Sequence, residues 1–410
     1  MHILLIHQAF ASLDEPGGTR HHELSRYLVG KGQRVTVIAS PVSYLTGSAR
    51  RDRLAGQDER VGDGVTVKRV YTYPALHKSF VHRVISFLSF MLSSFAVGLG
   101  VKQVDLIWGT SPPIFQGLTA WALARLKGVP FLFEVRDLWP AFAVAVGVLK
   151  QPFLVRASEL LELFLYRHAD VVVVNSPGFT AHVRKRGAKK VELVPNGSDT
   201  RMFDPQLDGS EFRKTYDLRE RFVALYAGAH GMSNDLEVLL EAANALSDRD
   251  DIRIVLVGDG KEKAALVRRS QEMGLTNVIF VPPVPKAEMQ DVLAAADACI
   301  AILKPVEMYK LVYPNKVFDY MAAGRAVILA IDGVIREVVE SAKAGITVSP
   351  GDVEALVEAI KRLAEERQTC IEMGLHGRRY VQEHFDREVL AEKMLATMQA
   401  LISADKSTAV

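Results

Sequence analysis

The sequence has little cysteine, and the two cysteines are far apart in the chain. Among 410 residues only Cys299 and Cys370 are cysteines, a number and spacing that fit neither a disulfide framework nor a zinc motif. Cys299 lies in an apolar run and is expected to be a small core residue. This use of cysteine favours a reducing cytoplasm as the compartment.

The sequence also lacks an excess of charge and a metal-binding motif. Its 50 basic and 48 acidic residues give a net charge of +2, so charge provides no argument for a nucleic-acid partner. The opening MHILLIHQAF has no basic segment or cleavage motif and predicts a first strand rather than a signal peptide. His21 and His22 are adjacent on a predicted helix and point to different faces, so they would chelate a metal poorly. We therefore predict no metal and no cofactor other than a co-substrate.

What the sequence does have is a regular alternation of apolar strands and helices, over a length too great for one core. This repetition predicts an α/β protein with doubly wound parallel sheets. Asn196-Gly197-Ser198-Asp199 interrupts the rhythm and marks a boundary. We predict a Rossmann-like N-terminal domain over 1–196 and a second over 197–385. The predicted strands are 3–6, 33–39, 65–71, 104–108, 130–134, 170–175 and 191–195, then 222–227, 252–257, 278–281, 298–303 and 326–331. The stretch 41–64 is predicted to be an irregular loop, and 386–402 an amphipathic terminal helix followed by a frayed tail.

One polar loop in the second half has the residue types of an anion site. It follows the predicted strand 298–303 and leads into a helix opened by Pro314 and ended by Gly324. Such a loop, at the carboxyl end of a parallel strand, is where open α/β sheets bind ligands. Lys310 and Lys316 flank free helix-start amides, and Asp319 lies one turn further on. Cations and amides suit a diphosphate, and a carboxylate suits a sugar diol, so the loop indicates a nucleotide sugar.

The segment PNKVFDYMAAGRAVI resembles the donor-binding signature of the family 4 retaining glycosyltransferases of GT-B fold. The matching residues are Lys316, Met321, Ala322, Gly324 and Val327. The resemblance implies two Rossmann-like domains facing a cleft, with the donor held by the second domain and the terminal helix crossing back to the first. The alternative is an ordinary strand–helix crossover with solvated lysines.

Two residues of this signature depart from the family pattern. The family's second glutamate is Asp319 here, and its first would fall at Leu311, which cannot make the usual carboxylate contact to the donor sugar. The loop YKLVYPNK is similar to a subgroup that builds bacterial surface glycans, where that glutamate is often absent.

The resemblance assigns further donor contacts to several turns. Relatives carry an arginine and a lysine after the strand that ends before Gly228, but this chain has Ala229 and no lysine before Lys261. Lys310, Lys316 and Arg20 would then supply the positive charge. A tight turn at 17–18 and a plain turn at 258–261 are the alternatives. The residues expected to bind the donor are Gly17, Gly18, Arg20, Arg136, Gly228, Gly231, Gly258, Lys261, Val284, Lys310, Pro314, Asn315 and Gly324.

The catalytic candidate is the segment from Glu134 to Pro140, EVRDLWP, at the carboxyl end of an apolar strand. Many relatives place a histidine here, whereas this chain has Asp137. A carboxylate could accept the proton of the acceptor hydroxyl or stabilise a cationic transition state. The alternative is that Arg136 and Asp137 form a structural pair. No second carboxylate can be placed at the spacing of a double displacement, so the family implies front-face attack. Lys316 and Asp319 complete the catalytic set.

The run 84–101 (VISFLSFMLSSFAVGLGV) has no charge over almost a membrane thickness and follows Lys78, His82 and Arg83. Three interpretations remain open: a buried helix, a helix with one apolar face on a membrane surface, and a true span, which would divide a Rossmann sheet. A membrane-surface helix would suit a polyprenyl-linked acceptor, and it predicts a peripheral enzyme on the cytoplasmic face of the inner membrane.

We therefore predict a retaining glycosyltransferase, with no nucleic-acid partner. It would move a sugar from a nucleotide diphosphate sugar to a hydroxyl of a lipid-linked or growing surface glycan. A UDP-sugar is the expected donor, and an N-acetylated amino sugar is one candidate. A nucleotide-sugar epimerase or a non-catalytic nucleotide-sugar-binding protein of the same fold is the alternative.

Overall fold

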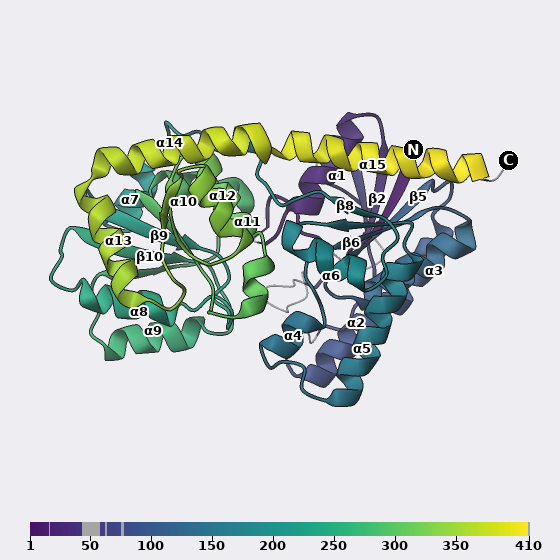
Figure 1. Cartoon of the computed structure of the whole chain (residues 1–410), viewed down its shortest axis with the longest axis horizontal. Helices are drawn as coiled ribbons and strands as arrows, with labels where there is room; N and C mark the ends of the chain where they lie inside the picture. Colours follow the sequence, from purple (N-terminus) through teal and green to yellow (C-terminus); the bar gives the residue numbers. More distant parts are fainter. Residues whose placement is uncertain (16, 43–57, 62–63, 75–77, 409–410) are drawn as a thin grey trace. The chain divides into compact units, whose positions relative to one another are not determined.

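The chain divides into two compact units, each with its own sheet (Figure 1). The structure, a computed structural model, describes residues 1–15, 17–42, 58–61, 64–74 and 78–408. Unit 1 comprises Met1–Ser12, Gly18–Pro195 and Glu388–Val410, and unit 2 comprises Leu13–Gly17 and Asn196–Arg387. The chain passes between units within two residues of the predicted boundaries, except that 13–17 belong to unit 2.

Unit 1 contains an eight-stranded sheet in the order β3-β4-β2-β1-β5-β6-β7-β8. Neighbouring strands are parallel, except that β3 runs antiparallel to β4. The order reverses between β1 and β5, so the turns that follow these two strands diverge there. The strands are β1 (His2–Ile6), β2 (Arg34–Ala39), β3 (Asp58–Val61), β4 (Val65–Arg69), β5 (Leu106–Ser111), β6 (Phe131–Val135), β7 (Val171–Val174) and β8 (Val191–Leu193).

Helices cover both faces of the unit 1 sheet because its strands are apolar on both sides. On one face, apolar residues of α1 and α15, among them Leu24, Leu28 and Met394, pack on strand residues such as Trp108. On the other face, α3 packs against α2 and α5. The helices are α1 (Arg20–Gly30), α2 (Phe80–Gly100), α3 (Phe115–Lys127), α4 (Ala141–Ala145), α5 (Pro152–His168), α6 (Thr180–Lys185) and α15 (Arg387–Thr408), with a 3-10 turn, η1 (Pro177–Phe179).

Unit 2 contains a six-stranded parallel sheet in the order β11-β10-β9-β12-β13-β14. Here the order reverses between β9 and β12. The strands are β9 (Phe222–Ala227), β10 (Ile252–Val257), β11 (Val278–Val281), β12 (Ala298–Ile302), β13 (Ala326–Ala330) and β14 (Gly345–Thr347). Five of these were predicted to within one residue, and β14 was not predicted.

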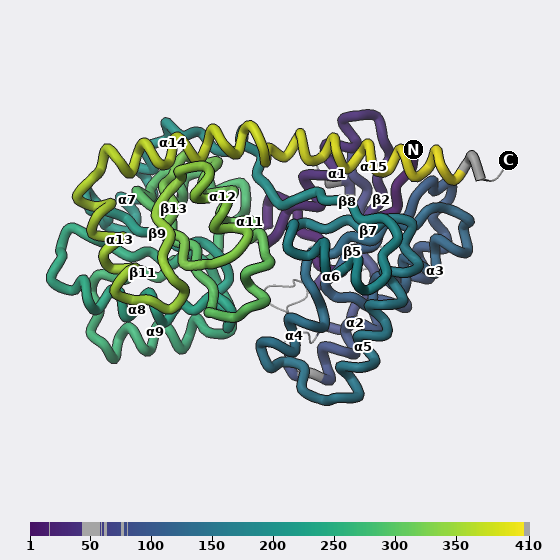
Figure 2. Tube along the Cα trace, in the orientation of Figure 1, coloured from purple at the N-terminus to yellow at the C-terminus, as the bar shows by residue number. Residues whose placement is uncertain are grey.

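The helices of unit 2 also lie on both faces of its sheet (Figure 2). Two apolar clusters, one on each face, hold the side chains of alternate strand residues. The helices are α7 (Ser210–Thr215), α8 (Glu237–Ala245), α9 (Lys263–Glu272), α10 (Met289–Ala294), α11 (Asn315–Ala322), α12 (Val334–Ser341), α13 (Val353–Glu365) and α14 (Arg367–His384), with 3-10 turns η2 (Thr200–Met202), η3 (Lys286–Glu288) and η4 (Glu307–Leu311).

Three local predictions differ from the structure. The helix α4 was not predicted, because its five apolar residues are too few to show a helical period. The terminal helix continues to Thr408, so most of the predicted frayed tail is wrong. The predicted loop 41–64 lies largely outside the described residues, but its described part includes β3.

Candidate functional site

Two glycine turns meet where the strand order of unit 2 reverses. Gly228 follows β9 and Gly258 follows β10, and a Cβ atom added to Gly258 would lie 1.9 Å from the carbonyl oxygen of Gly228. A Cβ on Gly260 would similarly lie 2.3 Å from the carbonyl oxygen of His230. Only glycine permits backbones to approach so closely. The predicted residues Gly228 and Gly258 are therefore brought together at the carboxyl edge of the sheet, and Gly231 follows in the same turn as Gly228.

Lys316, in the first turn of α11, reaches into this corner. Its Nζ donates a hydrogen bond to Tyr226 Oη at 2.8 Å and lies 3.9 Å from the centre of the Tyr226 ring. A Cβ atom added to Gly228 would lie 2.7 Å from the same Nζ, so the glycine is needed for the lysine to approach. Asn234 Oδ1 is 3.5 Å away. Burial lowers the pKa of Lys316 to about 7.

Lys316 places one amine at the strand end where the turn after β9 lacks two cations. Relatives were expected to carry an arginine and a lysine in that turn. Here the turn has Ala229, and the Lys316 ammonium arrives from α11 at the same strand end. In the free protein, burial removes water from the Lys316 ammonium, and its pKa is lowered for that reason. A diphosphate bound at this corner would relieve the cost of this burial.

Asp319 makes contacts different from those predicted. Its Oδ2 forms an ion pair with Lys286 Nζ at 2.6 Å and accepts a hydrogen bond from Asn315 Nδ2 at 3.2 Å. Its Oδ1 accepts a hydrogen bond from Ser198 Oγ at 2.7 Å. Lys286 is itself buried and lies over the Phe203 ring. Both carboxylate oxygens of Asp319 are thus occupied within unit 2, and the side chain anchors α11.

We expect Asp319→Ala to destabilise the protein strongly. The variant would leave the Lys286 ammonium buried without its carboxylate, and breaking a buried pair in this way costs about 3–5 kcal/mol. Urea unfolding followed by circular dichroism measures the free energy of unfolding. The matched control is Glu307→Ala, because Glu307 pairs with Lys310 on the surface and its loss should cost less than about 1 kcal/mol. Equal stability of the two variants would contradict this role.

The other predicted donor residues of unit 2 differ in how they are held. Lys310 is exposed and its Nζ lies 2.6 Å from Glu307 Oε1, so it does not reach the glycine corner as Lys316 does. Lys261 is exposed in the turn after β10, and Val284 is partly buried after β11. Pro314 caps α11, Asn315 bonds to Asp319, and Gly324 ends the helix region with a φ of 69°. A left-handed φ of that size favours glycine.

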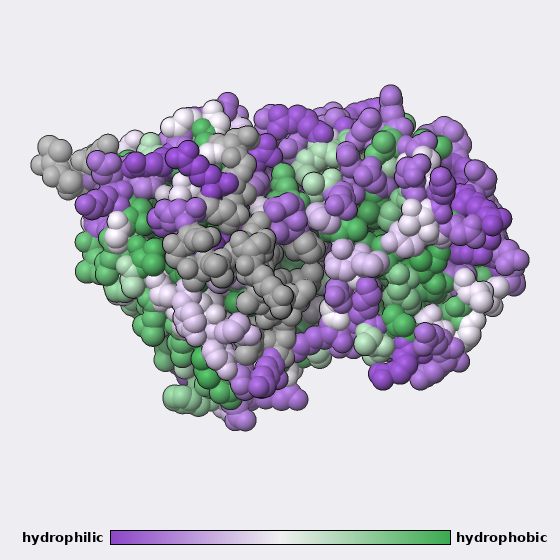
Figure 3. Space-filling model, turned by 180° about the vertical axis from the view of Figure 1, so that it is seen from behind, coloured by the Kyte–Doolittle hydropathy of each residue, from purple (hydrophilic) through white to green (hydrophobic). Residues whose placement is uncertain are grey.

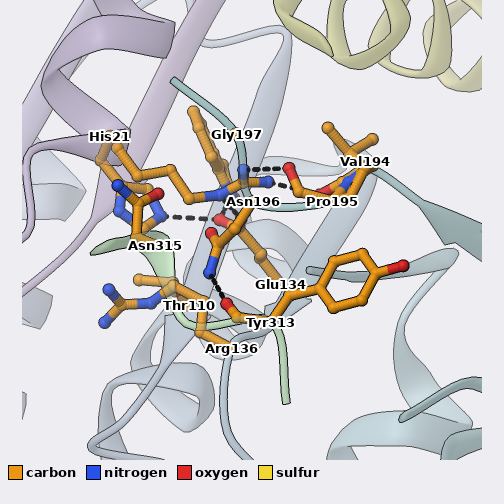
Figure 4. A network of polar contacts seen from close by, with 12 residues as sticks. His21, Thr110, Glu134, Arg136, Val194, Pro195, Asn196, Gly197, Tyr313 and Asn315 are labelled. Carbon is orange, nitrogen blue, oxygen red and sulfur yellow. Dashed lines mark hydrogen bonds and ion pairs between the residues drawn. The ribbon is translucent and has the colours of Figure 1, made fainter. Parts of the chain in front are cut away.

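In unit 1, Arg20 belongs to a buried network rather than to an open phosphate site. Its Nε lies 2.9 Å from Glu134 Oε1, and its two terminal nitrogens donate to the carbonyls of Pro195 and Val194 at 2.7 Å. Figure 4 shows the contact of Glu134 with His21 in this network. The structure therefore corrects the prediction for Arg20: the guanidinium is 5% exposed and holds the chain after β8 against the sheet.

His21 and Trp108 complete the surroundings of Glu134. His21 Nε2 lies 2.6 Å from Glu134 Oε2, and Trp108 Nε1 donates to the same oxygen at 3.1 Å. Burial lowers the pKa of His21 to about 4, so the ring is neutral near pH 7 and donates Nε2–H. Burial alone would raise the pKa of Glu134, but His21 and Arg20 hold it below its usual value. Glu134 is therefore a buried structural carboxylate.

Arg136 and Asp137 lie at the carboxyl end of β6. Arg136 donates through Nε to Thr110 Oγ1 at 3.1 Å and to the Ser111 carbonyl at 3.0 Å, which places it over the end of β5. Asp137 is half-buried, and burial raises the pKa of its carboxyl group to about 6, against the opposing effect of Arg136. A carboxylate with a pKa near neutrality at a strand end has the properties of a general base.

The glycines Gly17 and Gly18 do not form one structural group with Arg20. Gly17 has a φ of 145° and belongs to unit 2, whereas Gly18 begins the next part of unit 1.

Sequence reasoning also missed Tyr226 and Asn234 as partners of Lys316. Tyr226 occupies an apolar strand and is indistinguishable from a core residue in the sequence.

Two family models match the chain, one in each half. The glycosyl transferase 4-like domain matches residues 17–197, and glycosyl transferases group 1 matches residues 221–366. WcaI of Escherichia coli, which is named for a glycosyl transferase of colanic acid biosynthesis, is 24% identical over 381 residues, covering 89% of this chain and 92% of the relative.

Solved structures have the same fold over nearly the whole chain. Sucrose-phosphate synthase from Thermosynechococcus elongatus has a TM-score of 0.80 at 20% identity and covers 98% of this chain and 99% of its own. Anabaena HepE in complex with UDP-glucose has a TM-score of 0.74 at 18% identity and covers 98% and 100%. The predicted α/β architecture of two doubly wound sheets is confirmed. With both halves matched, the chain belongs to the group 1 glycosyltransferases of GT-B fold.

Proposed function

We propose that the chain transfers a sugar, with retention of anomeric configuration, from a nucleotide diphosphate sugar to a hydroxyl of a lipid-linked or growing surface glycan. The name of the colanic acid relative and the UDP-glucose complex of HepE support this class of reaction. A UDP-sugar is the proposed donor, with an N-acetylated amino sugar as one candidate.

The position of Lys316 is the observation that carries the proposal. A desolvated ammonium lies beside the glycine turn after β9, at the point where the strand order reverses. Ligands of open α/β sheets bind at such points. In this proposal Lys316 neutralises the diphosphate. The diphosphate can approach the backbone because the turns contain the glycines Gly228, Gly231 and Gly258. As the bond to the leaving diphosphate breaks, the same charge stabilises the oxygen that is left behind.

Asp319 has a positioning role in this proposal. Its bonds to Lys286 and Ser198 fix the direction of α11 and therefore the place of Lys316. Because both of its oxygens are occupied, we do not propose that it holds the donor ribose in the described conformation.

Asp137 would accept the proton of the acceptor hydroxyl. The hydroxyl oxygen would attack the anomeric carbon on the face from which the diphosphate departs, and the proton would pass to the Asp137 carboxylate. Arg136, held at the end of β5, would add positive charge at this strand edge.

The acceptor would be carried on a polyprenyl lipid, and the enzyme would work at the cytoplasmic face of the inner membrane. The support in the structure is the helix α2, which is long and apolar enough to cross a membrane. Only 22% of its most apolar stretch is buried in the protein, so much of the helix is open to a partner. It packs on α3 through Phe87 and Phe115, so we propose a helix lying on the membrane rather than a span.

A thermal-shift screen of UDP-, GDP- and ADP-sugars tests the donor proposal. A ligand that binds only the folded protein stabilises it by mass action, by about 2.7 kcal/mol at a hundred times its Kd. We expect UDP-sugars to raise the melting temperature. A wild-type protein that none of these nucleotide sugars stabilises would contradict the proposal.

A further inference from the structure

Large apolar side chains are exposed mainly on one part of unit 1. Of sixteen exposed large hydrophobic residues among those described, twelve lie between Tyr71 and Leu160, so the exposure is concentrated and not scattered. In α2, four of them follow a helical stripe: Val81, Ile85, Leu88 and Leu92. The residues on the opposite side of α2, such as Ser86 and Phe90, are buried. The stripe therefore faces away from the protein.

A second group of exposed apolar residues comes from α4 and α5. Phe153, in the first turn of α5, is 80% exposed, and Leu160 lies two turns further on the same helix. Val144 in α4 and Val148 just after it are also exposed. Removing so exposed a ring from water would be favourable.

These groups lie on one side and toward one edge of the unit 1 sheet. The helix α3 packs against both α2 and α5, so the three helices cover the same face. Both α2 and α5 begin near the carboxyl edge of the sheet, since α2 leads into β5 and α5 into β7. With 21 residues, α2 is ~31 Å long, longer than the ~20 Å strands it crosses. Figures 1 and 2 show α4 and the first parts of α2 and α5 gathered below the sheet.

Space-filling views agree with this arrangement. In Figure 3, which shows the other side of the molecule, hydrophobic residues run along the lower left border. At the carboxyl edge of the sheet, near which α2 and α5 begin, β6 ends at Val135, two residues before Asp137.

The charges around this surface are mainly basic. Between residues 64 and 104 the sequence has no Asp or Glu, and between 138 and 158 it has none either. The charged residues of these two stretches are basic: Lys68, Arg69, Lys78, Arg83 and Lys102 in the first, and Lys150 and Arg156 in the second. Lys78 precedes α2 and Lys150 precedes α5, and both are exposed. Arg156 is paired with Glu159 on α5, so the positive charge offered to a membrane is assigned to Lys78 and Lys150. An apolar surface with exposed lysines at its border is complementary to an anionic bilayer surface.

We infer that unit 1 docks on an anionic membrane through a two-part surface, formed by the outer stripe of α2 and by the α4–α5 turn with Phe153 as its anchor. We call this the docking surface. This inference rests on the proposed function only for the lipid-linked nature of the acceptor. A membrane bound to the docking surface would lie near the carboxyl edge of the sheet and therefore near Asp137. Phe153 inserts among the lipid chains, and Lys78 and Lys150 contact headgroups.

Vesicle flotation of the full chain tests the docking surface. The probes are vesicles of phosphatidylcholine containing one-third phosphatidylglycerol, and vesicles of phosphatidylcholine alone. We expect the wild type to float with the anionic vesicles, less with the neutral ones, and to be released by high salt. Phe153→Asp removes an inserted ring and adds a like charge, so binding should fall about tenfold or more.

The matched control is Leu126→Asp. Leu126 is 65% exposed at the end of α3, at the opposite edge of the same sheet, and its replacement should leave flotation unchanged. Equal loss in the two variants, or equal flotation of the wild type with both vesicle types, would overturn the inference. So would a wild type that does not float but forms a dimer that Phe153→Asp dissociates, because a second copy would then cover the surface.

Nucleotide binding separates this inference from the proposed function. Isothermal titration with UDP should give the same affinity for the wild type and for Phe153→Asp. A chain that floats as expected but binds none of the nucleotides tested would contradict the donor proposal alone. A chain that binds nucleotide but ignores anionic vesicles would contradict the docking surface alone.

Discussion

Lys316→Met should weaken binding of the donor nucleotide about 10–100-fold, as expected for the loss of one charge-assisted hydrogen bond of about 1.5–3 kcal/mol. Methionine has a similar length and no charge, so the glycine turns beside it can stay in place. Because burial disfavours the ammonium in the free protein, the variant should not lose stability at or below pH 7. Isothermal titration with UDP measures the affinity, and urea unfolding measures the stability.

The same lysine predicts proton uptake when the diphosphate binds. The pKa of Lys316 is lowered to about 7 in the free protein, so at pH 8 most of its amines are neutral. A bound diphosphate would raise that pKa again, and the lysine would take up close to one proton. Affinity should therefore fall as the pH rises above 7. Titrations in buffers with different ionisation enthalpies measure the uptake.

The control for this pair of experiments is Lys310→Met. Lys310 is exposed and paired with Glu307, so its replacement should change neither the affinity greatly nor the proton uptake. If Lys310→Met weakened UDP binding as much as Lys316→Met, the charge that meets the diphosphate would have been assigned to the wrong lysine.

Asp137→Asn should lower kcat about 100-fold or more while leaving donor affinity nearly unchanged. Asparagine keeps the shape of the side chain but cannot accept the hydroxyl proton. Burial raises the pKa of Asp137 to about 6, and only the ionised carboxylate can act as a base. The kcat of the wild type should therefore rise with pH through about 6, and this rise should be absent from the variant. Initial rates across a pH series measure both effects.

A structural role for Asp137 would give a different pattern. In that case Asp137→Asn would lower the free energy of unfolding, and kcat per folded molecule would stay near the wild-type value. The fold of the variant is checked by its melting temperature with and without UDP.

Much of the fold could be predicted because its signals are local. The strands of unit 2 are short apolar runs bounded by turns, and β9, β10 and β11 coincide with the predicted ranges. The segment from Pro314 to Gly324 likewise contains its own helix start and stop signals. The glycine after β9 was identified for the same reason, as a turn directly following a strand.

The contacts of the site could not be predicted in the same way, because each one joins distant parts of the chain. Lys316 and Asp319 are three residues apart on α11, yet Lys316 bonds to Tyr226 and Asp319 pairs with Lys286. Arg20 was expected at a phosphate because of the glycines before it. Its actual partners, Glu134 and the carbonyls after β8, are more than a hundred residues away. Local pattern predicts the element that carries a residue, but tertiary packing decides what its side chain meets.

The most direct test of the central claim is release of free nucleoside diphosphate from the donor that stabilises the protein. The wild type is incubated with this sugar nucleotide, with and without a lipid-linked glycan fraction. We predict that release requires the acceptor, that the sugar appears on the glycan in its original anomeric configuration, and that Lys316→Met is much slower. An isomerised donor without acceptor would indicate an epimerase, and binding without any turnover would indicate a non-catalytic protein. Either result would contradict the account.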